Sequence, residues 1–187
     1  AQPTPELWGK ACQVFLATLH FYRPFNSSCF EPSMKAASIA ELKKSLVKLD
    51  QGELLEAVLR LARFKKDNKE LLTYTLFLSH NESAYAALLC GGIDDQFALT
   101  PKAHKKTLRK LIRWMDKCLR YSGNKETEIQ VRIHFCRSLR SSETPFLKYP
   151  VMTNMYLGQL KKINKAIATF HEDIQYEWKM ELEELAL

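Results

Sequence analysis

From Ser38 onward, the chain carries apolar residues at spacings of three and four, the period of an amphipathic α-helix. Ser38 with Glu41, and Asp50 with Glu53, have the spacing of capping boxes, so each pair predicts the start of a helix. The second of these helices is expected to end near residues 65–66. No segment shows the polar–apolar alternation flanked by hairpin turns that predicts strands. The expected fold class is all-α.

Asparagine and glycine residues divide the next part of the helical pattern. Asn68 can cap a third helix and Asn81 a fourth, because an Asn side chain can accept a hydrogen bond from the first turn. The fourth helix is expected to stop at Gly91-Gly92, since glycine commonly follows a helix end. Residues 93–97 are then expected to form a connector.

The second half of the chain predicts at least three more helices. Thr100-Pro101 suits a helix start, with Thr as the cap and Pro at the first position, and residues 122–124 have the composition of a helix end. A helix is expected over about residues 125–139, followed by a turn region that contains two prolines. The apolar pattern from 157 to 185 predicts one long helix or two in tandem.

Short connections between these segments favour antiparallel helical hairpins, and hence a multi-helix bundle. A short α-solenoid-like array is the alternative, although residues 38–66 and 67–92 share no repeated signature. Residues 1–33 are rich in proline and are expected to form an N-terminal extension with one short helix, and residues 34–187 a single all-helical domain. An ordinary N-terminal helix packed on that domain is the alternative for the first segment.

A cationic stripe distinguishes the helix expected over residues 100–120. At roughly 100° per residue, its cations fall on one face and its apolar residues on the other. Such a face suits an acidic partner or the phosphates of a nucleic acid, but a solvated surface or an intramolecular ion-pair surface is the alternative. The basic stripe consists of Lys102, Lys106, Arg109, Arg113, Lys117 and Arg120.

The overall charge changes this picture in two ways. A formal net charge of +7 raises the expectation of an anionic partner. The stretch from Glu172 to Glu184 is, however, strongly acidic, so it could neutralise the basic stripe within the fold or between subunits. The aromatic residues of this C-terminal stretch are expected to be core residues or anchors of a subunit interface.

The residues that carry chemistry give no catalytic or metal site. His134 and Cys136 are two apart on an expected helix, so their side chains diverge and cannot chelate one ion. Five cysteines without a C-x-x-C pair favour a reducing compartment and core packing. No nucleophile, dinucleotide or phosphate-loop motif occurs. We therefore expect no catalytic residues, no metal and no cofactor.

No apolar run approaches the roughly 18 to 20 residues of a membrane span, so a soluble, cytoplasmic protein is expected. The segments Glu41–Lys44, Leu54–Glu56, Lys161–Ile167 and His171–Gln175 resemble uncharacterised all-helical bacterial proteins without an assigned activity. This resemblance covers Met34 to Trp178. It implies a bacterial cytosolic helical domain and supplies no site residues.

These patterns lead to one main functional hypothesis and two alternatives. The main hypothesis is a helical protein-interaction or structural domain without catalytic activity, which presents its surface to a protein partner or a second copy of itself. The first alternative is nucleic-acid or polyanion binding through the basic helix 100–120. The second is an enzyme in which His134 or His171 meets carboxylates in a pocket between helices.

Overall fold

The computed structural model describes residues 35–185. The chain divides into two compact units, and the boundary along the sequence falls between Leu49 and Asp50. Eight α-helices and no strand occur in this described part, so the all-α fold class is confirmed. The expected extension, residues 1–33, lies outside it. The helices are α2 (Ile39–Leu46), α3 (Gln51–Phe64), α4 (Lys66–Thr73), α5 (Glu82–Leu99), α6 (Lys105–Ser122), α7 (Lys125–Ser141), α8 (Pro150–Ile167) and α9 (Glu172–Glu183).

Two shorter elements complete the second unit. A π-helix, η3 (Tyr74–Leu78), continues directly from α4, and a 3₁₀ turn, η4 (Phe146–Lys148), precedes α8. The expected C-terminal helix is thus two helices in tandem, α8 and α9. None of the described helices is both long enough and apolar enough to cross a bilayer.

Of the five helix starts expected from capping residues, three are confirmed and two, at Asn68 and Thr100, are wrong. Ser38 and Asp50 form complete capping boxes with Glu41 and Glu53. Asn81 accepts a 2.9 Å hydrogen bond from the backbone N–H of Ala84. The start expected at Asn68 is wrong because α4 begins at Lys66, and the Asn68 amide donates instead to the Leu61 carbonyl at 2.9 Å.

The helix end expected at Gly91-Gly92 is also wrong, since α5 runs unbroken to Leu99. The reason is packing between helices. A Cβ atom at Gly92 would lie 2.9 Å from Cη2 of Trp114, so the missing side chain lets the indole of α6 lie against the backbone of α5. Gly92 is therefore a contact position, and residues 93–97 are helix.

The basic helix starts later than Thr100-Pro101 predicts, at Lys105. The segment before it is held to the loop that follows α7, because the Ala103 N–H donates to Oγ1 of Thr144 at 2.9 Å. Lys102 therefore lies outside the helix. The other end is as expected: Gly123 has a φ of 68°, the left-handed conformation that ends a helix.

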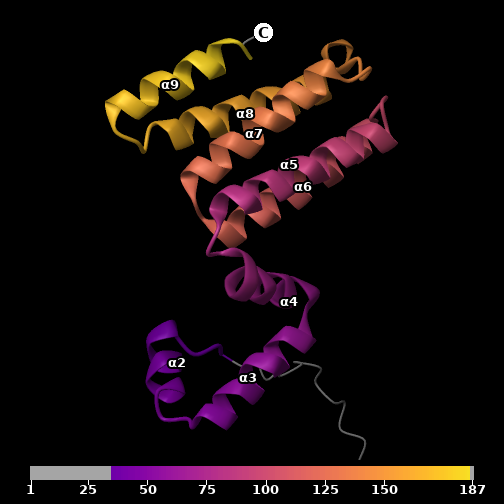
Figure 1. The fold of residues 1–187 in the computed structure, drawn as a ribbon. Helices are drawn as coiled ribbons and strands as arrows, with labels where there is room; N and C mark the ends of the chain where they lie inside the picture. The colour runs from indigo at the N-terminus through magenta and orange to yellow at the C-terminus, as the bar shows by residue number, and fades with distance from the viewer. Residues whose placement is uncertain (1–34, 186–187) are drawn as a thin grey trace, which may run out of the picture. The chain divides into compact units, whose positions relative to one another are not determined.

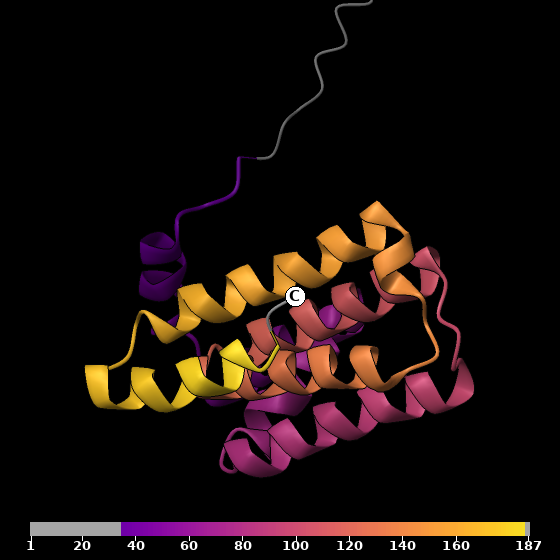
Figure 2. The ribbon, with the colours of Figure 1, turned by 90° about the horizontal axis from the view of Figure 1, so that it is seen from above.

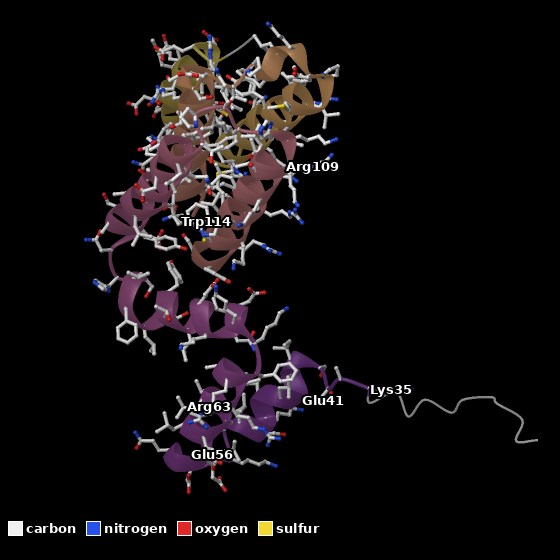
Figure 3. All side chains as sticks on the ribbon, turned by 90° about the vertical axis from the view of Figure 1, so that its right-hand side faces the viewer. Lys35, Glu41, Glu56, Arg63, Arg109 and Trp114 are labelled. Carbon is white, nitrogen blue, oxygen red and sulfur yellow. The ribbon has the colours of Figure 1, made fainter. Side chains whose placement is uncertain are left out.

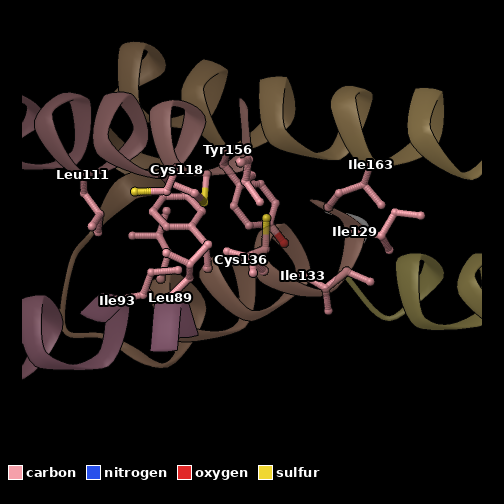
Figure 4. Close-up of a cluster of buried hydrophobic side chains, with 14 of the residues drawn as sticks. Leu89, Ile93, Leu111, Cys118, Ile129, Ile133, Cys136, Tyr156 and Ile163 are labelled. Atoms are coloured by element: carbon pink, nitrogen blue, oxygen red, sulfur yellow. The ribbon is translucent and has the colours of Figure 1, made fainter. Parts of the chain in front are cut away.

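The core of the second unit is formed by α5, α6, α7 and α8, with α9 packed against α8 (Figures 1 and 2). Figure 4 shows side chains from these helices meeting in one apolar cluster, including Leu89 of α5, Leu111 of α6 and Ile133 of α7. Tyr156 of α8 is fully buried beside them. Phe64 and Phe77 lie outside this core, and both rings are exposed.

Candidate functional site

The structure separates the basic stripe into paired and unpaired cations. Lys117 faces α4, where its ammonium lies 2.6 Å from Glu70 and 3.3 Å from Asp67. Hydrogen bonding to Glu70 raises the pKa of Lys117 and lowers that of the Glu70 carboxyl. Lys102 forms an exposed ion pair with Glu143 at 3.4 Å. These two cations therefore have partners within the chain.

The other four members of the stripe, Lys106, Arg109, Arg113 and Arg120, are exposed on α6. No carboxylate between residues 35 and 185 forms an ion pair with any of them. Arg113 and Arg120 instead donate to backbone carbonyls of their own helix. Arg109 lies on the outer side of α6, as Figure 3 shows. These four side chains are thus available to an outside anion.

The acidic C-terminal helix does not neutralise this face. Within the described residues, the ion pairs of α9 to other helices go to α7, where Arg137 lies 3.1 Å from Glu181 and 3.6 Å from Glu184. Arg140 adds a hydrogen bond to the Glu184 carbonyl. The opposite charge blocks of the sequence are therefore not paired with each other in this part of the chain.

Two adjoining pockets lie beside the cations of α6 and form what we call the α6–α8 groove. The first, of about 690 Å³, lies near the starts of both helices; the second, of about 460 Å³, lies farther along. Both are lined by Val151, so they adjoin. The first pocket is lined by Lys102, Ala103, His104, Lys105, Lys106, Pro145, Tyr149, Pro150, Val151 and Met152. The second is lined by Arg109, Ile112, Arg113, Val151, Asn154, Met155, Gly158, Gln159 and Lys162.

The two walls of the groove run in the same direction. Lys106 at the start of α6 lines the same pocket as Val151 at the start of α8. Farther along, Asp116 of α6 forms an ion pair with Lys162 of α8 at 2.7 Å. None of the described residues that line the two pockets is Asp or Glu. The groove therefore combines apolar side chains with basic groups from both helices.

The α8 wall of the groove contains a glycine, Gly158. It lies in the interior of α8, where glycine costs roughly 0.5–1 kcal/mol relative to alanine. No other atom lies within 4 Å of where its Cβ would be, so internal packing does not require the missing side chain. The backbone of α8 is thus bare at the groove, and an occupant could approach it closely.

A buried charge network lies beneath the far end of the groove, where Gln159 and Lys162 belong to the lining. Arg132 of α7 is only 4% exposed and contacts Asp116 at 2.8 Å and Glu128 at 3.0 Å. It also donates to Gln159 of α8 at 2.6 Å. The Asp116 contact is an ion pair without hydrogen-bond geometry, since Oδ1 has no hydrogen-bond partner. These contacts join α6, α7 and α8 beneath the groove.

The cations of this network keep its carboxylates charged. Burial opposes the ionisation of Asp116, but the hydrogen bond from Lys162 and the positive charges of Arg132 and Lys162 outweigh it, so its pKa is lowered. Burial acts on Glu128 in the same way, and Lys125 and Arg132 lower its pKa. Sequence reasoning missed this network. The available signal was Arg132 on the apolar face of its helix, with Glu128 one turn before it.

His134 and His171 belong to no Ser-His-Asp triad and no metal cluster in the described part of the chain. Nε2 of His134 lies 2.8 Å from Oδ1 of Asp94, and the Ser138 hydroxyl donates to the same oxygen at 3.1 Å. In a Ser-His-Asp triad the histidine bridges the other two residues, whereas here the carboxylate does. His171 contacts only the exposed Asp173. No group of three His, Cys, Asp or Glu suited to a metal ion occurs within residues 35–185.

The cysteines that the structure describes are free thiols. Cys118 and Cys136 are buried, as expected of core residues, and burial raises the pKa of Cys136 to about 12. A thiol with so high a pKa is a poor nucleophile near neutral pH. These two side chains therefore serve packing.

No family model, curated protein or solved structure matches this chain. The chemistry of the α6–α8 groove must therefore be interpreted from its own residues.

Proposed function

We propose that this protein is a helical interaction domain that binds an acidic amphipathic helix of a protein partner in the α6–α8 groove. The observation that carries the proposal is the combination of an apolar floor with a basic wall on the α6 side. Ile112, Met155 and Val151 provide the floor, and Arg109 and Arg113 stand on the α6 side. This is the complement of a helix with an apolar ridge beside an acidic flank.

The floor of the groove supplies the apolar contact that such a helix needs. A helix docks by placing residues of one face, three or four apart, into a groove. Met155 is unbranched and adaptable, so it can fill the space around different side chains. Gly158 leaves room for a close approach of the docked helix to α8. Burial of the apolar ridge would supply most of the affinity.

The basic α6 wall determines the sign of the charge that a partner must carry. Arg109, Arg113 and Lys106 have no ion-pair partner in the described chain, so an acidic helix need not displace an internal carboxylate. Exposed charge pairs contribute only roughly 0 to 1 kcal/mol each, but they steer association and favour acidic over basic partners. Binding should weaken as salt is added.

A nucleic acid is the second candidate partner, favoured by the four unpaired cations of α6. Its phosphates would gain from those charges but not from the apolar floor. Stacking on single strands needs aromatic side chains, and among the residues that line the groove pockets only Tyr149 and His104 carry such a ring. The groove therefore favours the acidic helix.

The test is a fluorescence anisotropy titration of the purified protein at low and at moderate salt. The probes are a labelled helix-forming peptide with leucines four apart between glutamates, a duplex DNA and a single-stranded RNA. The groove variant is Arg109→Glu with Arg113→Glu. The matched control is Arg60→Glu with Arg63→Glu, which makes the same charge change on exposed residues of α3.

We expect salt-sensitive binding of the peptide that falls at least about tenfold in the groove variant and stays unchanged in the α3 control. If DNA or RNA binds more tightly than the peptide, and this binding is lost in the groove variant, the partner of the groove is a nucleic acid. Peptide binding that is equal in both variants would place the binding surface elsewhere.

A further inference from the structure

We infer that the acidic helix that occupies the α6–α8 groove is α9 of a second copy of this chain. The inference rests on the proposed function and names the partner. It is carried by the outer face of α9, whose pattern of charge and apolarity is the complement of the groove.

The outer face of α9 has an apolar ridge between two acidic flanks. Tyr176 and Met180 are one turn apart, and their side chains are 68% and 56% exposed. At roughly 100° per residue, Glu183 falls on one side of this ridge together with the exposed Lys179, and Asp173 and Glu177 fall on the other. The unpaired cations of the groove stand on its α6 side, because Lys162 of the α8 side pairs with Asp116. The flank with Asp173 and Glu177 is thus the complement of the α6 wall, and the apolar ridge is the complement of the floor.

Two glutamates on these flanks have no ion-pair partner among the described residues. Glu177 and Glu183 are exposed, and no cation in the described range forms an ion pair with either. The acids in α9 and at its C-terminal cap that reach another helix are Glu181 and Glu184, which contact α7. An outside cation can therefore pair with Glu177 or Glu183 without breaking an internal contact.

The outer face of α9 cannot reach the groove of its own chain while α9 stays packed. The inner side of this helix places Trp178 and Leu182 against the core. The Tyr156 hydroxyl of α8 also donates to the Leu185 carbonyl at 2.6 Å, just beyond the end of α9. With α9 held in this way, its acidic face is available only to another molecule.

This contact joins two different surfaces, so it is head-to-tail. It closes as a reciprocal pair or a ring, or else continues as a chain of molecules. One helix face in one groove is smaller than a standard interface of roughly 1,600 Å², so we expect weak association, with a Kd on the order of 10 µM or above. The contact should be salt-sensitive, because its rims are charged.

The experiment is sedimentation velocity of the full chain from about 5 to 500 µM, at low and at moderate salt. The groove-reversed variant is again Arg109→Glu with Arg113→Glu. The helix-reversed variant is Glu177→Lys with Glu183→Lys, and the control is the α3 variant described above. The two reversed variants are measured separately and as an equimolar mixture, because a reversed helix should fit a reversed groove.

We expect the wild type and the α3 control to associate at low salt. Each reversed variant alone should associate at least about tenfold more weakly, and the mixture should regain a heavier species. Restoration on mixing also shows that both variants fold. The inference is overturned if the wild type sediments as a monomer throughout, or if the helix-reversed variant associates like the wild type. Should the chain stay monomeric while its groove binds the designed acidic peptide, the inference fails and the proposed function stands; if neither binds, both fail.

Discussion

Glycine residues have opposite roles at two positions of the bundle. At Gly92 the neighbouring helix fills the space of the missing side chain with the ring of Trp114. At Gly158 nothing fills it, and the bare backbone faces the groove. The sequence shows a glycine within an apolar helical pattern in both cases. Only the position of the adjacent helix distinguishes a contact site from a binding surface.

Gly92→Ala is expected to destabilise the protein by about 1 kcal/mol, because the new methyl group must displace the Trp114 ring. Gly91→Ala is the matched control, since no atom lies within 4 Å of its Cβ position. It should stabilise the protein by roughly 0.5–1 kcal/mol through helix propensity. Urea denaturation measures both changes. Equal effects of the two substitutions would contradict the packing of Trp114 on Gly92.

Gly158→Leu is expected to leave the fold at least as stable as the wild type, because the side chain enters open space and improves helix propensity. It should nevertheless weaken binding of the acidic peptide at least about tenfold, since it fills the floor of the groove. Gly91→Leu, on α5, should leave peptide binding unchanged. Undiminished binding by Gly158→Leu would show that the partner does not enter the groove at α8.

Single cations also show where the sequence falls short. Arg113 and Lys117 are one helical turn apart and belong to the same stripe, so periodicity cannot distinguish them. In the structure Lys117 pairs with Glu70 of α4, while Arg113 stays free. The difference arises from a helix more than forty residues earlier in the chain. A stripe therefore identifies candidate cations without showing which remain available.

Among the elements, local capping chemistry was the most reliable signal. The boundary between α6 and α7 follows from it: Gly123 ends one helix, and Asn124 caps the next by accepting hydrogen bonds from the Glu126 and Thr127 N–H groups. The errors at Asn68, Gly91-Gly92 and Thr100-Pro101 all involve contacts with other helices or loops. A local sequence pattern does not predict those contacts.

Asn124→Ala is expected to lower the free energy of unfolding by about 1 kcal/mol, because it leaves two first-turn N–H groups of α7 without their acceptor. Asn164→Ala, at an exposed position inside α8, is the control and should be neutral or slightly stabilising. Thermal or urea unfolding of both variants measures the difference. No loss on Asn124→Ala would mean that α7 does not depend on this cap.

For the whole molecule, the charge network beneath the groove predicts acid sensitivity. The pKa values of Asp116 and Glu128 are lowered from 3.8 and 4.5 in the folded state. A lowered folded pKa stabilises the protein above the unfolded value, and this stabilisation is lost as the pH falls through the folded value. The free energy of unfolding should therefore decrease as the pH falls below about 4.5.

Urea unfolding midpoints at about pH 7, 4 and 3 test this expectation. Asp116→Asn should flatten the pH dependence and should also lower stability at pH 7, because Arg132 and Lys162 lose a charged partner. An acid-independent midpoint in the wild type would show that the folded state does not favour the charged carboxylates.

Only the α6 side of the candidate site could be predicted from the sequence. The α6 wall follows from the basic stripe, since charge and period are both local properties. The α8 wall does not, because Val151, Met155 and Gly158 read as ordinary helix positions until α8 is packed beside α6. The all-α class needed only the helical period. The groove needed the tertiary arrangement.

The most direct test of the groove is backbone amide chemical-shift mapping of the ¹⁵N-labelled protein with the designed acidic peptide. Binding in the groove predicts that the largest shifts fall at residues 105–113 of α6 and 151–162 of α8 and that moderate salt suppresses them. Chemical-shift changes confined to α3 and α4, or no changes in the presence of a large excess of peptide, would contradict the proposal that this groove is the binding surface.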